Sequence, residues 1–295
     1  MMSLNCERRF WLSLQLLAFC FAGVLLWILA SMAMRVSLGD VVVMLMSDGI
    51  QSSVKLSIMT SSISAAIATL LSVPIGYVLA RRTFFAKWLV EAICIIPISA
   101  PPLVFGLALL IFFQSTAGQL IEANVWKFTF QVSGIVLCQC LITSAYAIQW
   151  MQTVFHQQSN RPEQIALTLG CNRWGAFFRV TIPEARPAIT TVALMAWAHC
   201  MGVFGPILVF AGMIRGRTEV LSTTIWLELQ SGNLEAAIVA SLLLIVVAVS
   251  VTAIAKRLQL SIGRSAVTRS AATQTAATPA AVDQTAATPA GRADD

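Results

Sequence analysis

The sequence predicts an all-α membrane protein with six transmembrane helices, and two observations carry that prediction. Of its 295 residues, 58% are hydrophobic and only 11% are charged, whereas about a quarter of the residues in a soluble domain are charged. Six apolar stretches are also long enough to cross a hydrocarbon layer, which takes about 20 helical residues. They lie near residues 10–32, 53–80, 88–113, 131–153, 188–213 and 234–256.

The first two stretches are expected to be complete spans. Arg8 and Arg9 precede the first one, as in a signal peptide. Its apolar run is longer than the roughly 7–15 residues of a signal, so we expect it to be retained. The second carries small residues at helical spacing, which lets neighbouring helices approach closely. Hydroxyls lining a polar route are the alternative for this stripe of Ser57, Ser61, Ala65, Ala68 and Ser72.

Helix-breaking residues interrupt the third and fifth stretches near their middles. Pro101 and Pro102 lie in the third, and Gly202, Gly205 and Pro206 lie in the fifth. Broken helices are tolerated at membrane depth where the freed backbone is buried or lines a cavity, and in transporters they often mark the substrate route. Each break could equally be a packing kink.

The distribution of basic residues predicts the orientation. With both termini in the cytoplasm, fourteen of the nineteen lysines and arginines lie inside, as positive-inside topology requires. The basic character therefore reflects membrane orientation and gives no support for nucleic acid binding. Of the five residues left outside, Arg215 and Arg217 could draw an oxyanion toward the pore, contact a binding protein or simply be solvated. The five are Lys55, Lys127, Arg35, Arg215 and Arg217.

A polar segment, "RPEQIALTLGCNRWGAFFRVTIPEARPAI", separates the fourth stretch from the fifth. Pro162 suits the first turn of a helix, and Glu163 suits its positive N-terminal end. Gly170 is expected to end that helix at positive φ. A second short helix is expected from Trp174 to Val180, ended by a proline. The pair could form a docking surface or lie on the lipid headgroups.

The same segment resembles the cytoplasmic loop of binding-protein-dependent ABC importer permeases. That loop reads E-A-A-x-x-x-G, nine residues, then I-x-L-P; here Gln164-Ile165-Ala166 lead to Gly170, and nine residues later comes Val180-Thr181-Ile182-Pro183. The Glu falls one position early, at Glu163. The resemblance implies a type I importer permease fold with a two-helix coupling loop at 156–187. Its site residues would be Glu163, Gln164, Ile165, Ala166, Leu169, Gly170, Val180, Ile182 and Pro183.

The resemblance extends over residues 50–257, and within the family the chain is most similar to the molybdate, tungstate and sulfate branch. Where that branch commonly reads F-A-R-A-x-G-E-F-G, this chain has "WAHCMGVFG" at 197–205. The usual Arg and Glu, four residues apart on one helix face, are His199 and Val203. His199 could be a histidine bonded to a neighbouring helix or a pathway residue. The candidate pathway or gate residues are Pro101, Pro102, His199, Gly202, Val203, Gly205 and Pro206.

The resemblance also implies a function and partners. The chain would be the permease subunit of an ATP-driven importer in a bacterial inner membrane, moving molybdate, or else tungstate or sulfate. It would work with cytoplasmic ATPase subunits, a second permease copy and an extracytoplasmic binding protein. No G-x-x-x-x-G-K-[ST] motif occurs, so ATP and Mg²⁺ would be used by the ATPase and this chain would hold no cofactor. Alternatives are a secondary carrier, an importer of another solute, and a membrane scaffold or enzyme.

Composition divides the chain in two. Residues 1–262 are expected to form the transmembrane domain. From 263 to 295 the sequence turns to Ala, Thr, Pro and Gln, and "QTAATPA" occurs twice. Such a segment cannot bury a core, so we expect a disordered cytoplasmic tail.

Overall fold

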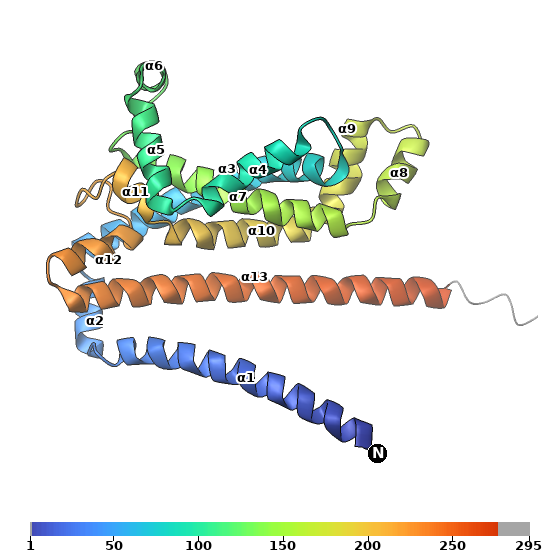
Figure 1. The fold of residues 1–295 in the computed structure, drawn as a ribbon, viewed down its shortest axis with the longest axis horizontal. Coiled ribbons are helices and arrows are strands. Elements are labelled where there is room, and N and C mark those ends of the chain that lie inside the picture. Colours follow the sequence, from blue (N-terminus) through green and yellow to red (C-terminus); the bar gives the residue numbers. More distant parts are fainter. Residues whose placement is uncertain (1, 277–295) are drawn as a thin grey trace, which may run out of the picture.

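The computed structural model describes residues 2–276, and these form helices and no strand (Figure 1). In chain order the helices are α1 (Met2–Ala33), α2 (Leu38–Leu45), α3 (Asp48–Arg81), α4 (Lys87–Ser99), α5 (Pro102–Gln114), α6 (Thr116–Asn124), α7 (Val132–Gln157), α8 (Arg161–Thr168), α9 (Arg173–Ala176), the π-helical turn η1 (Phe177–Thr181), α10 (Ile182–Gly202), α11 (Gly205–Phe210), α12 (Leu221–Gln230) and α13 (Leu234–Ala276).

The centre of the bundle is the contact between α3 and α7, where small residues let two backbones approach closely. A Cβ at Gly76 would lie 2.8 Å from Met151 Cβ and 2.9 Å from the backbone nitrogen of Gln152, so only glycine fits there. The small-residue stripe of α3 is buried along its length. It comprises Ser57, Ser61, Ala65, Ala68 and Ser72.

A buried glutamine joins three helices of the bundle. Ser64 Oγ on α3 donates to Gln139 Oε1 on α7 at 3.1 Å, and Gln139 Nε2 donates to the carbonyl of Cys200 on α10 at 3.1 Å. A buried amide is stable only when it is hydrogen-bonded. Gln139 therefore fixes the relative height of α3, α7 and α10.

The expected third span, 88–113, is divided into α4 and α5, which meet at 109°. A residue that precedes proline is pushed out of the helical region, and Ala100 and Pro101 accordingly have ψ of 142° and 132°. The prolines interrupt this stretch as expected. The bend is so large, however, that α4 and α5 are separate helices, which together form either one broken span or a re-entrant loop.

The expected fifth span, 188–213, is also divided. α10 begins six residues earlier, at Ile182, and ends at Gly202, and α11 follows from Gly205 to Phe210. The break lies at Val203, with ψ 121°, and Phe204, with φ −125° and ψ −59°. The break therefore falls among Gly202, Gly205 and Pro206, where an interruption of the fifth stretch was expected.

The count of six spans stays a prediction. By length and composition, four described helices could cross a membrane, with spans at 10–33, 48–81, 132–157 and 234–257, and α4 with α5 would make a fifth. α10 is not among them. Its first turns carry Glu184 and Arg186, and the break after Gly202 shortens its apolar run.

α13 packs against α10 and α12 on one side of the bundle, and α1 lies beyond α13 (Figure 1). The spanning part of α1, Phe10–Ala33, has no buried residue. α13 continues to Ala276, fourteen residues past the expected boundary at residue 262, and the expected division into domain and tail stays a prediction. The rest of the expected tail, 277–295, lies outside the described residues.

Candidate functional site: a loop at one end of the bundle and a cavity within it

The loop after α7 begins with α8, which ends where the sequence predicts. Gly170 has φ +89°, the positive φ that favours glycine. Around it the Cys171 N–H donates to the Ala166 carbonyl at 3.0 Å, and the Gly170 N–H donates to the Leu167 carbonyl at 3.1 Å. These two bonds form a Schellman motif, which satisfies the last carbonyls of the helix. The chain therefore turns sharply and rigidly at Gly170.

Glu163 ties this loop to the bundle. The Tyr77 hydroxyl on α3 donates to Glu163 Oε1, and the Thr181 hydroxyl donates to Oε2 at 3.3 Å. Glu163 thus links α8 to α3 and to η1. Gln164, which holds the family's glutamate position in strict register, has an exposed side chain. The glutamate one position early, Glu163, is therefore the residue that makes the contact between the loop and the bundle.

The outer face of the loop is apolar and exposed. Leu169 is 81% exposed and Trp174 is 73% exposed, and Ile165 and Phe178 are exposed as well. The Trp174 and Phe178 rings stack with their centroids 6.0 Å apart. Trp174 and Phe178 were missed as site residues, although aromatic residues four apart in a polar segment are a usable signal. We call these four residues the apolar loop face.

The remaining site residues hold the loop rather than face outward. Ala166, Val180, Ile182 and Pro183 are half-buried. Ile182 packs on the core cluster that contains Met151, Phe155 and Phe177. They therefore lie where the loop meets the bundle.

The expectation that a second short helix ends at Pro183 is wrong. α9 passes through η1 directly into α10, and Pro183 lies in the first turn of α10. A proline is tolerated there because it has no N–H to leave unpaired. The widened turn of η1 thus connects the loop to α10 without a loose segment.

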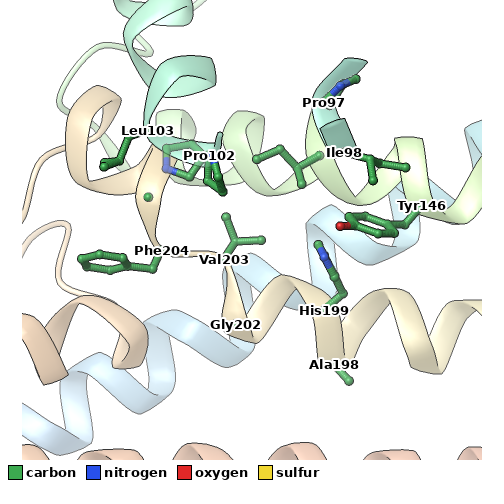
Figure 2. A pocket seen from close by; sticks show the side chains of 13 residues that line it. Pro97, Ile98, Pro102, Leu103, Tyr146, Ala198, His199, Gly202, Val203 and Phe204 are labelled. Carbon is green, nitrogen blue, oxygen red and sulfur yellow. The ribbon is translucent and has the colours of Figure 1, made fainter. Parts of the chain in front are cut away.

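The two broken stretches, α4 with α5 and α10 with α11, meet at one cavity of about 560 Å³ (Figure 2). Its walls come from α4, α5, α7, α10 and α11. Six of the seven candidate pathway residues line it, and Pro101 does not. The six are Pro102, His199, Gly202, Val203, Gly205 and Pro206.

The backbones at the two breaks are in direct contact. A Cβ at Gly106 of α5 would lie 2.7 Å from Pro206 Cα, and a Cβ at Gly205 of α11 would lie 3.0 Å from Pro102 Cβ. Glycine is therefore required at Gly106, and a side chain at Gly205 would be tightly confined. The sequence identified both breaks but gave no sign that they touch.

His199 makes the interhelical bond and also lines the cavity. Its Nδ1 lies 3.1 Å from Thr143 Oγ1 on α7, and its ring lies 4.3 Å from the Tyr146 ring. Cys200 Sγ donates to the same Thr143 oxygen at 3.2 Å. His199 is thus bonded to a neighbouring helix, as one expectation has it, and it also lines the cavity (Figure 2). Its role in a transport pathway stays a prediction.

Val203 lies beyond the end of α10, so it does not share a helix face with His199. It is buried, and its carbonyl accepts a hydrogen bond of 2.9 Å from Ser222 Oγ on α12. That bond satisfies a carbonyl that the helix break would leave free. His199 and Val203 nevertheless line the same cavity.

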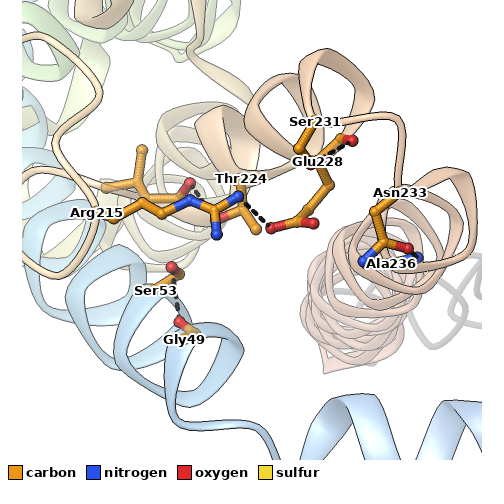
Figure 3. A network of polar contacts seen from close by, with 9 residues as sticks. Gly49, Ser53, Arg215, Thr224, Glu228, Ser231, Asn233 and Ala236 are labelled. Atoms are coloured by element: carbon orange, nitrogen blue, oxygen red, sulfur yellow. Dashed lines mark hydrogen bonds and ion pairs between the residues drawn. The ribbon is translucent and has the colours of Figure 1, made fainter.

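At the opposite end of the bundle the two outer arginines are partly engaged. Arg215 forms a 3.0 Å ion pair with Glu228 (Figure 3), and Arg217 donates to Gln131 Oε1 at 3.0 Å. Arg215 remains 60% exposed. These contacts order the surface of the loop around α12 and leave Arg215 accessible to solvent.

Glu122 orders the neighbouring loop at this end. It accepts the backbone N–H groups of Phe128 at 2.9 Å and Thr129 at 2.7 Å. Burial alone would raise the pKa of Glu122, but the hydrogen bonds from Thr129 and Phe128, with the charge of Lys127, outweigh it and lower that pKa. Glu122 therefore stays ionised and holds the turn before α7.

An apolar helical bundle with two broken spans meeting at a cavity, and with an amphipathic loop at one end, is the architecture of an integral membrane transport protein. The model of the binding-protein-dependent transport system inner membrane component family matches residues 72–264. The chain belongs to this family of ABC importer permeases.

Relatives agree with this assignment. The chain is 30% identical to the molybdenum transport system permease protein ModB of Mycobacterium tuberculosis over 222 residues, 75% of this chain and 84% of ModB. It is 34% identical to the molybdate/tungstate permease WtpB of Thermococcus kodakarensis over 52% of this chain and 58% of WtpB. In fold it resembles a chain of a bacterial alginate ABC transporter crystallised with its periplasmic protein, with TM-score 0.62 and 17% identity, over 84% of this chain and 95% of that one.

Proposed function

We propose that this permease imports a small oxyanion, molybdate in the first place and otherwise tungstate or sulfate. The observation that carries the proposal is the 30% identity to a molybdenum permease over three quarters of the chain. A sulfate permease, CysW of Synechococcus elongatus, is 27% identical over 58% of this chain and 61% of its own length. Family membership sets aside the secondary carrier and the scaffold or enzyme, and another small solute remains the second candidate.

The apolar loop face is proposed to bind a separate ATPase subunit. Exposed apolar patches with polar surroundings are typical of protein–protein contacts. Glu163 and η1 couple this face to α3 and to α10. Movement of the loop would then be carried along α10 to His199 and to the break at Val203.

The complete importer is proposed to contain two permease copies, two ATPases and an extracytoplasmic binding protein. Both termini and the loop 156–187 would lie in the cytoplasm, and α6 with Arg215 would lie outside. Support for this orientation comes from the sequence, in which fourteen of the nineteen lysines and arginines belong to segments that this topology puts inside. ATP-driven closure of the ATPases would rock the bundles and expose the cavity alternately to the two sides.

The lining of the cavity suits passage rather than retention of an anion. Tyr146 and His199 are its only titratable side chains, and no lysine or arginine lines it. A fixed positive charge in a medium of low dielectric constant would hold an oxyanion strongly. Selectivity would therefore rest with the binding protein.

Uptake by reconstituted vesicles tests the substrate. With the ATPase, the binding protein and ATP present, we expect radiolabelled molybdate to accumulate inside, and unlabelled tungstate and sulfate to compete. Omission of ATP is the control. Accumulation of another solute, with no molybdate, would contradict the oxyanion assignment and leave the family assignment intact.

His199→Ala should lower the rate of uptake severalfold without lowering the amount of protein in the membrane or its association with the ATPase. Thr143→Val is the matched control because it removes the hydrogen bond to the ring and leaves the imidazole in the cavity. It also removes the acceptor of the Cys200 Sγ hydrogen bond, and each of these two bonds contributes about 1 kcal/mol to stability. Equal effects of the two variants on uptake, matched by equal losses of thermal stability, would return His199 to a structural role.

A further inference from the structure

A second set of cavities runs along the outside of the bundle, next to the apolar loop face. The first, of about 320 Å³, lies between the end of α3 and the loop. Three arginines line it, Arg81 and Arg82 from α3 and Arg173 from α9, together with Asn160 and Gln164. It is therefore a basic, hydrogen-bonding recess at the end of a membrane-spanning helix.

The charge of this recess is not neutralised within the protein. Glu163 is its one carboxylate, and it already accepts hydroxyl hydrogens from Tyr77 and Thr181. Neither of the two ion pairs found among the described residues includes any of the three arginines. Arg81 donates one Nη2 hydrogen bond to the Gln158 carbonyl, and its buried Nε has no partner. The recess thus keeps an excess of positive charge and free donors.

The recess continues into an apolar groove. A cavity of about 200 Å³ shares Arg82 and Arg173 with it and adds Pro74, Trp174 and Phe177. A further cavity of about 670 Å³ shares those last three residues. That cavity then runs between α3 and α10, past Leu70, Ile189 and Ala193. The polar recess therefore leads directly into the apolar groove, in the same order as the headgroup and the acyl chain of a phospholipid.

We infer that this trough binds one anionic phospholipid. The phosphate lies between Arg82 and Arg173, whose planar guanidinium groups match phosphate geometry. One acyl chain follows the groove between α3 and α10. A free phosphate would leave the apolar groove unfilled. An apolar helix of another copy would cover the arginines without offering them a partner, which is unfavourable for a charged group.

The position also agrees with a lipid. α3 is a candidate span from Asp48 to Arg81, so its last residues lie at the height where headgroups begin. Basic residues at that height attract anionic lipids. The inference needs only that α3 crosses the membrane. It does not depend on the transported solute or on the ATPase.

A bound lipid would touch both α3 and the loop, through Pro74 on one side and Arg173 with Trp174 on the other. It would therefore stabilise the placement of the apolar loop face against the bundle. The amount of anionic lipid in the membrane would then determine how firmly the loop is held against α3.

Native mass spectrometry of the full chain, purified in detergent, tests the site with phosphatidylglycerol and phosphatidylcholine as probes. We expect retained phosphatidylglycerol in preference to phosphatidylcholine. The double change Arg82→Gln with Arg173→Gln should weaken phosphatidylglycerol binding by about thirtyfold, since each basic residue contributes separately. The matched control is Arg179→Gln with Arg186→Gln, two exposed arginines of the same segment outside the trough.

Two further arms complete the test. Ala193→Phe should weaken binding of long-chain phosphatidylglycerol by filling the groove, and inorganic phosphate should not displace the lipid. If the double variant inserts poorly, each single substitution should give a smaller loss of the same kind. Equal retention of both lipids, equal losses in the double variant and its control, or displacement by phosphate alone would each overturn the inference. None of these outcomes bears on uptake of the solute.

Discussion

Gly170→Val is expected to leave the permease in the membrane but to abolish its hold on the ATPase and its ATP-dependent uptake. Gly170 has φ +89°. A β-branched side chain at positive φ costs about 1–2 kcal/mol or more. The space around Gly170 is open, so the strain comes from the backbone and not from a clash. Relief of that strain would open the Schellman turn and displace Leu169. Co-purification of the ATPase and uptake by vesicles measure the effect.

Gly170→Asn is the matched control, because asparagine tolerates the left-handed region better than other side chains. It should retain most of the ATPase association and uptake. Full uptake and normal ATPase retention in Gly170→Val would mean that the loop is not the coupling element.

Gly106→Leu is expected to have the largest effect on stability. Its Cβ would lie 2.7 Å from Pro206 Cα and 3.0 Å from the Pro206 carbonyl, and neither backbone atom can move aside as a side-chain end could. Overpacking of this kind costs about 1–3 kcal/mol. The crossing of α5 and α11 should open, the thermal unfolding temperature should fall, and uptake should be lost.

The matched control is Gly23→Leu on α1, where an added Cβ meets nothing within 4 Å. It should unfold and transport like the parent. If Gly106→Leu unfolded at the parent's temperature and transported at the parent's rate, the contact between the two broken spans would not exist in the working protein.

Local features of the site were predictable because local residues decide them. Gly170 ends α8 since glycine is favoured at positive φ, and Pro101 with Pro102 break the chain since proline restricts the residue before it. The effect of Pro183 was misjudged because proline can begin a helical turn as well as follow one. The 109° bend between α4 and α5 has no local signature.

Contacts between distant residues could not be predicted in this way. The charge of Glu163 suggested a helix start, but its partner Tyr77 lies 86 residues away and is set by how α3 packs. The same holds for Ser222, which satisfies the carbonyl of Val203. The pattern of small residues predicts that helices approach closely, but it does not say which glycine meets which neighbour.

Site-specific photo-cross-linking tests most directly whether the loop is the ATPase-binding surface. A photoreactive amino acid replaces Leu169, which is 81% exposed on the apolar loop face, or Val125, which is 70% exposed. Val125 directly follows α6, at the other end of the bundle from α8 and α9 (Figure 1). In membranes that contain the ATPase, we predict a cross-linked permease–ATPase product from the Leu169 position and none from the Val125 position. A product from Val125 alone, or none from either position while uptake continues, would contradict the assignment.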